Sequence, residues 1–214
     1  MGVAERKARE FKKREQEILH TAYELFKTRG FDTVTIDMIA DEVEIGKGTI
    51  YQHFKSKHEI YALLVLEQLE ELQIELEKID KSLPVAEQAR LLIRTHLEFW
   101  LKDLDRHKIM HLCLNHLSQE NLGKELQAKV MEFSCRKHSQ HYPMIEKAKE
   151  EGLLIDIPAE YAMLIAGGLM TGVADMLASD HIELKIGSIS REDVDYDLLY
   201  QAIETVLIKG LMNI

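Results

Sequence analysis

Polar side chains suited to nucleic-acid binding follow one another between residues 47 and 57 of this 214-residue chain. Lys47 supplies a cation, Thr49 a hydroxyl and Gln52 an amide, while Gly48 lets another backbone approach closely. Such groups bind phosphates together with helix N–H donors, and amide, hydroxyl and cationic groups also read base edges. We therefore regard residues 47–57 as a candidate DNA-contacting segment.

Two short helices are expected to position this segment. Apolar residues recur at i, i+3, i+4 and i+7, the pattern of a two-turn helix, in Ile36, Ile39, Ala40 and Val43. Thr35 is placed to cap this helix, residues 44–46 interrupt the pattern, and a second helix begins at about Lys47. Ile50 and Phe54 lie on the inner side of the second helix. Two short helices with such a turn predict a helix-turn-helix whose second helix enters the DNA major groove.

The stretch GKGTIYQHFKSK, preceded by TIDMIADEV, resembles the DNA-binding domain of the tetracycline-repressor (TetR) family of bacterial transcriptional regulators. The resemblance is specific over about residues 14–65. It implies that Lys57 contacts phosphate and that the outward side chains of the second helix face DNA. The DNA-contacting set predicted from this chemistry and the resemblance comprises Thr35, Lys47, Gly48, Thr49, Tyr51, Gln52, His53 and Lys57.

The turn departs from the family pattern at two positions. Glu44 stands where the family usually has glycine, so we expect a positive φ that is costly for a residue with a side chain. Gly46 stands where the family has serine or a similar cap, which weakens the cap by only a few tenths of a kcal/mol.

The whole chain is predicted to be all-α, because helical periodicity recurs throughout and only residues 182–189 alternate like a strand. A helix over residues 11–29, ending at Gly30 in the left-handed conformation, completes a three-helix head. Longer helices are expected over residues 57–79, 84–104, 124–151, 158–178 and from Asp193 or Asp195 to Leu211. We predict a DNA-binding domain over residues 1–57 and a helical-bundle effector-binding and dimerisation domain over residues 58–214.

The charge is divided between these two regions. Residues 1–57 carry 11 Lys and Arg against 10 Asp and Glu, whereas residues 58–214 carry 16 against 27, giving the net −10 of the chain. The negative charge of residues 58–214, the body of the chain, limits nonspecific DNA binding. Salt largely screens this charge at the distance of the head. Six cations cluster before residue 15, where they either contact phosphates or the minor groove or belong to a solvated helix start. These are Arg6, Lys7, Arg9, Lys12, Lys13 and Arg14.

The body is expected to bind a partner subunit and a small hydrophobic effector. The segment 158–178 has almost no polar face, so with residues 198–207 it predicts a four-helix homodimer interface; an intramolecular core helix is the alternative. Aromatic and Met-rich linings suit hydrophobic ligands. As the resemblance implies a pocket, the predicted effector-binding residues are Phe99, Trp100, Met110, His111, Cys113, Leu114, Met163, Gly167 and Met170.

Other functions rest on weaker patterns. His107 and His111 are four residues apart and His138 and His141 three apart, a spacing that can hold a metal, and Cys113 and Cys135 admit a redox switch. The sequence shows no phosphate loop, GxSxG, HExxH or dinucleotide glycine pattern, so we expect neither an enzyme nor a cofactor. A protein-interaction module that no longer binds DNA is a further alternative. The charged N-terminus and the short apolar run 162–174 predict a cytoplasmic protein without a membrane span.

Overall fold

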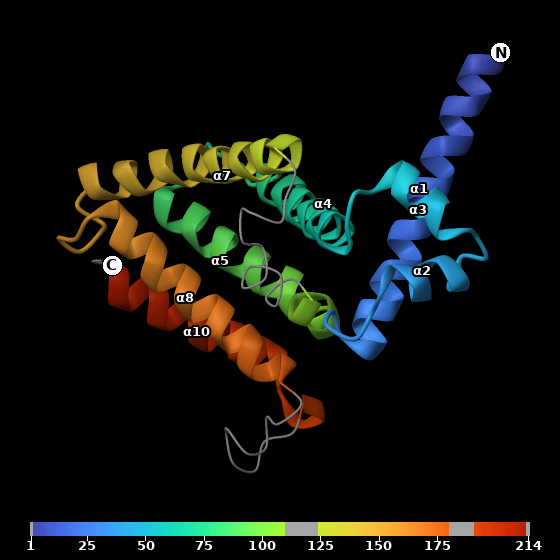
Figure 1. Ribbon diagram of the computed structural model, residues 1–214. Coiled ribbons are helices and arrows are strands. Elements are labelled where there is room, and N and C mark those ends of the chain that lie inside the picture. The colour runs from blue at the N-terminus through green and yellow to red at the C-terminus, as the bar shows by residue number, and fades with distance from the viewer. Residues whose placement is uncertain (1, 110–123, 180–190, 213–214) are drawn as a thin grey trace. The chain divides into compact units, whose positions relative to one another are not determined.

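The computed structural model describes residues 2–109, 124–179 and 191–212, and most of these are helical (Figure 1). The helices are α1 (Val3–Arg29), α2 (Ile36–Glu42), α3 (Lys47–His53), α4 (Lys57–Glu77), α5 (Val85–Leu101), α7 (Lys124–Glu150), α8 (Ala159–Ala178) and α10 (Tyr196–Leu211). Residues 104–109 are also helical, and a 3₁₀ turn covers Arg191–Asp193. The all-α prediction is therefore confirmed. The strand-like residues 182–189 lie outside the described residues.

Side-chain oxygens cap the first turn of three helices. Thr35 accepts a hydrogen bond from the Met38 N–H at 3.2 Å, Ser56 from Glu59 N–H at 3.1 Å, and Asp195 from Leu198 N–H at 3.0 Å. Gly30 ends α1 with φ 76° but ψ 152°, so the left-handed helical geometry predicted there is wrong. The positive φ still requires a glycine.

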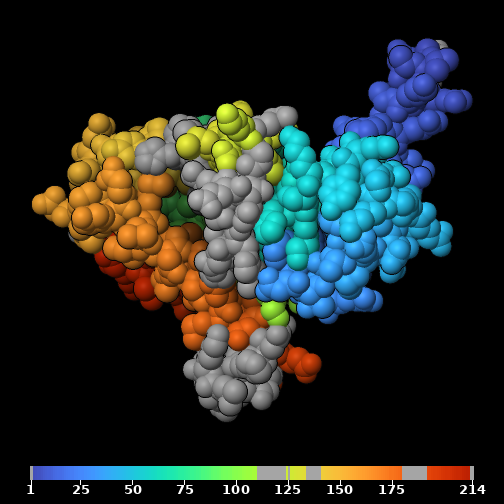
Figure 2. Space-filling model, in the orientation of Figure 1, coloured from blue at the N-terminus to red at the C-terminus, as the bar shows by residue number. Residues whose placement is uncertain are grey.

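The first helix begins earlier than predicted. We expected it from about residue 11, but α1 starts at Val3, where the Gly2 N–H binds the Glu5 carboxylate at 2.9 Å. Its early turns carry ion pairs such as Arg6–Glu10 at 3.3 Å, which add slight support to an exposed helix. In Figure 2 these turns stand away from the rest of the head as dark-blue atoms.

The chain forms two compact units, Met1–Gln68 with Ile109–Val130, and Leu69–Lys108 with Met131–Ile214. In the first unit, α1, α2, α3 and the start of α4 enclose a small core around Ile18, Ile39, Ile50 and Ile60, each 0% exposed. Burying each such side chain contributes about 1.5–3 kcal/mol. The division into functional domains at residues 57 and 58 stays a prediction.

An aromatic cluster closes the core of the first unit. The Tyr61 ring lies 5.2 Å from Phe26 and 4.5 Å from Phe31, and its buried hydroxyl donates to the Ile109 carbonyl. Buried tyrosines need such a partner for the hydroxyl. The cluster therefore holds the first turns of α4 against α1 and against the residues that follow α1.

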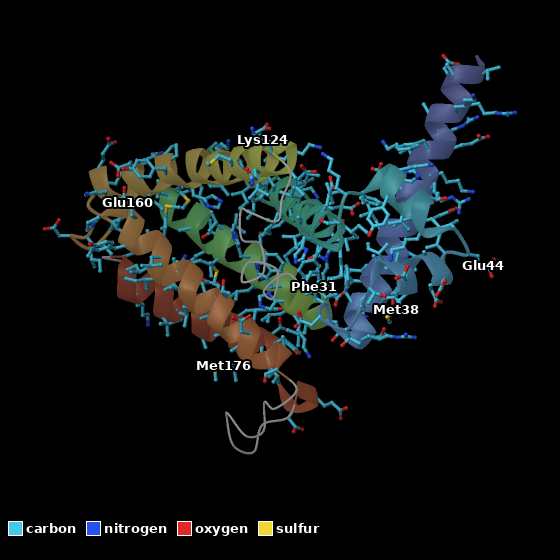
Figure 3. All side chains as sticks on the ribbon, in the orientation of Figure 1. Phe31, Met38, Glu44, Lys124, Glu160 and Met176 are labelled. Atoms are coloured by element: carbon cyan, nitrogen blue, oxygen red, sulfur yellow. The ribbon has the colours of Figure 1, made fainter. Side chains whose placement is uncertain are left out.

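In the second unit α5 contacts α8 and α10, and α8 contacts α10. The inner faces meet through buried apolar residues, namely Ile93, Leu97, Trp100, Ala162, Met170, Ala174, Leu177, Ile203 and Leu207. The opposite side of α8 is exposed, as is Met176 in Figure 3. Among the described helices α8 alone is long and apolar enough to cross a membrane, a test that a core or interface helix also passes.

Candidate nucleic-acid interface

The turn between α2 and α3 has the predicted geometry. Glu44 adopts φ 57° and lies on the outside of the turn (Figure 3), so the positive φ predicted for this residue is confirmed. The Ile45 N–H donates to the Ala40 carbonyl at 2.9 Å and closes the turn behind it. Gly46 is the N-cap of α3 and, having no side chain, leaves the first N–H groups of α3 without a side-chain acceptor. Those N–H groups are consequently suited to meet phosphate oxygens.

The outer face of α3 presents several of the predicted side chains to solvent. Lys47, Gly48, Tyr51 and Gln52 are exposed and Thr49 is half-buried, whereas Ile50 between them is fully buried. The Tyr51 side chain is among the large exposed apolar groups, at 51%. A Cβ atom added at Gly48 would meet nothing within 4 Å, so packing inside the chain does not require glycine there. This face is therefore free to contact a ligand as broad as a duplex.

A salt bridge joins the start of α3 to the first turn of α2. Lys47 Nζ lies 2.8 Å from Asp37 Oδ2, and this hydrogen bond raises the pKa of Lys47. Both side chains are exposed, so the pair contributes little stability. It holds Lys47 on the same outer side as Thr35, whose hydroxyl caps α2.

His53 does not lie on the outer face of α3, and its predicted exposure is wrong. The imidazole stacks on Phe11 of α1 with ring centroids 3.9 Å apart, and its side chain is only 4% exposed. Nδ1 lies 4.0 Å from the Glu15 carboxylate. Because α3 ends at His53, this stack fixes the end of the helix against α1, which positions the exposed residues before it.

Burial lowers the pKa of His53, an effect that Arg14 reinforces and Glu15 opposes. The unfolded chain therefore binds more protons than the folded chain at a pH between the folded pKa and about 6.5, and stability falls as the pH drops through that window. We expect His53→Gln to lose less stability than the wild type between about pH 7.5 and 5.5. Urea unfolding midpoints at both values measure the difference.

The matched control for this prediction is His20→Gln, because His20 is an exposed histidine of α1. It should lose as much stability as the wild type over the same pH range. If His53→Gln also responds like the wild type, titration of His53 does not contribute to acid sensitivity.

Lys57 is directed toward the head and not toward solvent. Its ammonium donates to the carbonyls of Phe31 at 2.6 Å and Val34 at 2.8 Å and lies 4.2 Å from the centre of the Phe31 ring. Desolvation lowers the pKa of Lys57. The ammonium therefore fastens the start of α4 to the α1–α2 connection, a role that the resemblance alone did not suggest.

The predicted effector-binding residues are only partly within the described chain. Met110, His111, Cys113 and Leu114 lie outside it. Trp100 of α5 and Met170 of α8 are buried at 7% exposure, while Phe99, Met163 and Gly167 are half-buried. The Phe99 ring is 4.9 Å from Trp100 and lies beneath the Arg106 guanidinium at 5.3 Å. The structure thus places an aromatic pair on the helix that contacts α8.

A buried histidine and an aspartate form a pair that was not predicted from the sequence. His107 is fully buried, its Nε2 is 2.8 Å from Asp175 Oδ1, and its ring is 5.4 Å from Trp100. The sequence did contain a signal, because Asp175 is the one charged residue in the second half of α8. No sequence pattern indicates that these two positions, 68 residues apart, are in contact.

Other polar groups in the described chain form no metal site. No three His, Cys, Asp or Glu side chains among the described residues could hold an ion together. The side chains of Cys135 and His138 lie outside the description, and His141 is buried with its ring 5.7 Å from His96.

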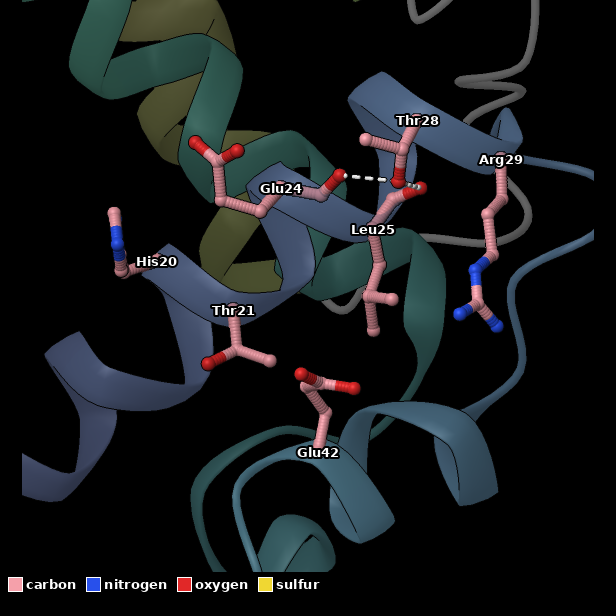
Figure 4. Close-up of a pocket in the computed structure, with 7 residues that line it drawn as sticks. All are labelled: His20, Thr21, Glu24, Leu25, Thr28, Arg29 and Glu42. Atoms are coloured by element: carbon pink, nitrogen blue, oxygen red, sulfur yellow. Dashed lines mark hydrogen bonds between the residues drawn. The ribbon is translucent and has the colours of Figure 1, made fainter.

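A groove of about 370 Å³ lies between the second half of α1 and the end of α2 (Figure 4). Its lining consists of His20, Thr21, Glu24, Leu25, Thr28, Arg29 and Glu42. The Thr28 hydroxyl is engaged with the Glu24 carbonyl at 2.8 Å. Two carboxylates in this lining disfavour phosphate binding. The groove therefore differs from the outer face of α3, which suits an anionic ligand.

A buried first core, a tight turn and an exposed second helix define a helix-turn-helix protein of the DNA-binding class. Residues 18–64 match the family model described as "Bacterial regulatory proteins, tetR family". This match covers the helix-turn-helix head, so the chain carries a head of the tetR-family type, and a solved tetR-family protein shares the fold.

Curated relatives match only part of the chain. The chain is 33% identical over 87 residues to YhgD, an uncharacterized HTH-type transcriptional regulator of Bacillus subtilis, covering 40% of this chain and 46% of YhgD. It is 39% identical over 49 residues to an HTH-type transcriptional regulator of Staphylococcus aureus, covering 23% of this chain and 26% of that one. The chain thus matches less than half the length of either relative.

Solved structures match the fold along nearly the whole chain. A TetR-family regulatory protein from Rhodococcus RHA1 superposes with a TM-score of 0.71 at 16% identity, covering 91% of this chain and 95% of the other. The fatty acid degradation regulator FadR from Bacillus halodurans gives 0.66 at 16%, covering 91% and 94%. The ketosteroid regulator KstR2 of Mycobacterium tuberculosis gives 0.66 at 17%, covering 94% and 96%. The helical fold of the chain is therefore shared with these solved structures.

Proposed function

We propose that the protein is a ligand-responsive transcriptional repressor that binds a pseudo-palindromic operator as a homodimer in the cytoplasm. The observation that carries this proposal is the polar outer face of α3, exposed beside the fully buried Ile50. In a helix-turn-helix that face enters the major groove. In this proposal Tyr51 and Gln52 contact base edges and sugar-phosphate. Lys47, Thr49 and the N–H groups near Gly48 contact phosphates.

Thr35, His53 and Lys57 take supporting roles in this proposal. Thr35 begins α2 on the exposed side and can offer phosphate its hydroxyl proton while its oxygen caps the helix. His53 holds the end of α3 through the Phe11 stack, and Lys57 holds the start of α4 through two carbonyls. Both residues therefore affect DNA affinity through the orientation of α3 and α4.

The proposed dimer interface is the exposed apolar side of α8 and α10. Large apolar side chains at helical spacing are left uncovered on both helices, namely Tyr161 at 59%, Leu164 at 72%, Ile165 at 48%, Leu198 at 63% and Val206 at 60%. Large apolar patches of this kind mark association surfaces. A second copy related by a two-fold axis would cover them with the same pair of helices.

The glycines of α8 support a contact with another chain. A Cβ added at Gly167, Gly168 or Gly172 meets nothing within 4 Å in this chain. Packing inside one subunit therefore does not require them. Close approach of two α8 helices across a two-fold axis would require residues without a side chain at these positions.

The proposed effector site lies on α5 and α8 beside Trp100, Met170 and the His107–Asp175 pair. Buried aromatic and Met side chains suit a hydrophobic ligand, and the imidazole can orient one polar group of that ligand. Two fold relatives are a fatty acid degradation regulator and a ketosteroid regulator by name, and both names concern hydrophobic molecules. We therefore propose a hydrophobic small molecule as the effector.

The response is proposed to pass through α4. Lys57 fastens its first turn to the head through two carbonyls, and Tyr61 does so through its contacts with Phe26 and Phe31. A displacement of α4 therefore moves the head, and α3 with it. An effector that prefers the displaced state by about 2.7 kcal/mol lowers operator affinity a hundredfold, and operator weakens effector binding equally.

Selection of genomic fragments by the purified full-length protein tests the DNA-binding function. We expect a small set of fragments sharing an inverted repeat, with half-sites about one duplex turn or a multiple apart. Their affinity should fall steeply with salt. A protein-interaction module or an enzyme using the body histidines would retain no fragment specifically, and that result at low ionic strength would overturn the proposal.

A further inference from the structure

The N-terminal turns of α1 lie outside the region that defines the family head. The family model begins at residue 18, whereas α1 begins at Val3, so residues 3–17 add about four helical turns. These turns extend beyond α2 and α3 in Figure 1. Nearly all their side chains are exposed, so their composition is not dictated by the core of the head.

One stripe of α1 changes character along its length. Ile18, Ala22 and Leu25 occupy its buried part and pack in the head core. The same stripe continues at helical spacing toward the N-terminus as Arg14, Phe11 and Lys7. Where the core ends, the stripe therefore turns from apolar to cationic.

This stripe is held against the end of α3. Phe11 stacks on His53 at 3.9 Å, and Arg14 lies close enough for its charge to lower the pKa of that imidazole. Lys7 follows one turn beyond Phe11 on the same side of α1. Because His53 is the last residue of α3, Lys7 and Arg14 lie on the side of α1 that faces the recognition helix.

The charges on this side are available for an anionic partner. Lys7 is exposed and makes no ion pair with any described residue. Arg14 pairs with Glu17 at 2.9 Å, a contact between partly exposed groups that costs little to exchange for phosphate. Two of the other cations, Arg9 and Lys12, lie on the opposite side of α1.

We propose that Lys7 and Arg14 bind the phosphate backbone beside the half-site read by α3. This inference rests on the proposed operator binding and extends its footprint beyond the helix-turn-helix. The stacked Phe11 and His53 fix the direction of the cationic stripe, so little ordering entropy is lost on binding. Phosphate contacts of this kind add affinity and register without reading sequence.

Two double variants of the full-length protein test the proposal on a duplex recovered by genomic selection, extended by about one turn on each side. Lys7→Ala with Arg14→Ala should lower affinity at least tenfold near 0.15 M salt. The slope of log affinity against log salt should become shallower by about 0.9 for each phosphate that is no longer neutralised, or roughly 3.6 for a dimer. Hydroxyl-radical protection of the flanking backbone should disappear while the half-sites stay protected.

The matched control is Arg9→Ala with Lys12→Ala, which removes the same charge from the opposite side of the same helix. It should keep the wild-type slope to within about one unit and keep the flanking protection. Alanine favours the helix in both variants, which circular dichroism verifies. Equal effects of the two variants, or none from Lys7 and Arg14, overturn the proposal while operator binding stands. A wild type that binds no fragment overturns the proposed function itself.

Discussion

Tyr51→Ala is expected to abolish most specific operator binding while leaving a folded dimer. Tyr51 is 51% exposed on the outer face of α3, so its removal disturbs no core packing. Removing a side chain that binds a base or phosphate costs about 1–3 kcal/mol per half-site, and the dimer carries two. Operator affinity should therefore fall by about 2–6 kcal/mol, or roughly thirtyfold and more, in a fluorescence anisotropy titration at fixed salt.

Two further variants show whether that weakening belongs to the α3 face. Lys47→Ala should also weaken binding and make it less salt-dependent, because it removes a cation that binds phosphate. Gln16→Ala, at an exposed residue of α1, should leave affinity within about twofold of the wild type, as a surface change within ±0.5 kcal/mol implies. An unchanged affinity in Tyr51→Ala would remove that side chain from the site.

Leu164→Arg is expected to produce a folded monomer that no longer binds its operator. Leu164 is 72% exposed in one subunit, so the single chain does not depend on it for packing. Across a two-fold axis the new guanidinium would be buried near its copy without a partner, which costs several kcal/mol. Sedimentation velocity should show a monomer with unchanged helical content.

The fall in affinity follows from the absence of the second half-site interaction. Two linked heads bind with an advantage of about 10²–10⁴ over one, and the monomer forfeits it. Ile74→Arg supplies the matched control, because Ile74 is 56% exposed on α4 and lies outside the α8 and α10 face. It should remain dimeric and bind operator normally. A Leu164→Arg protein that still sediments as a dimer would move the interface elsewhere.

The helix-turn-helix could be predicted from the sequence because interactions between residues close together in the chain determine it. Thr35 caps α2 through a residue three positions away, and Glu44 takes the positive φ that its place in the turn demands. Both features depend on neighbours along the chain, so spacing and residue type suffice to predict them. The apolar periodicity of α2 and α3 likewise identified Ile39 and Ile50 as core.

The orientation of long polar side chains was decided by partners far along the chain. His53 turns inward because Phe11, 42 residues earlier in the chain, lies beside it. Lys57 turns inward because the Phe31 and Val34 carbonyls accept hydrogen bonds from its ammonium. Neither interaction has a sequence pattern. Exposure inferred from helical position therefore failed for His53, although it held for Tyr51 and Gln52.

The sequence by itself determined an all-α chain, the Thr35 cap of α2 and a recognition helix α3 with a polar outer face, because each of these follows from interactions within a few residues. Only the tertiary structure decided that His107 binds Asp175, that His53 is a packing residue, and that the outer side of α8 is uncovered. Those outcomes depend on which helices meet and which faces they bury. Amphipathicity gives a helix an inner side, but the helix has a neighbour on that side only once the fold brings distant segments together.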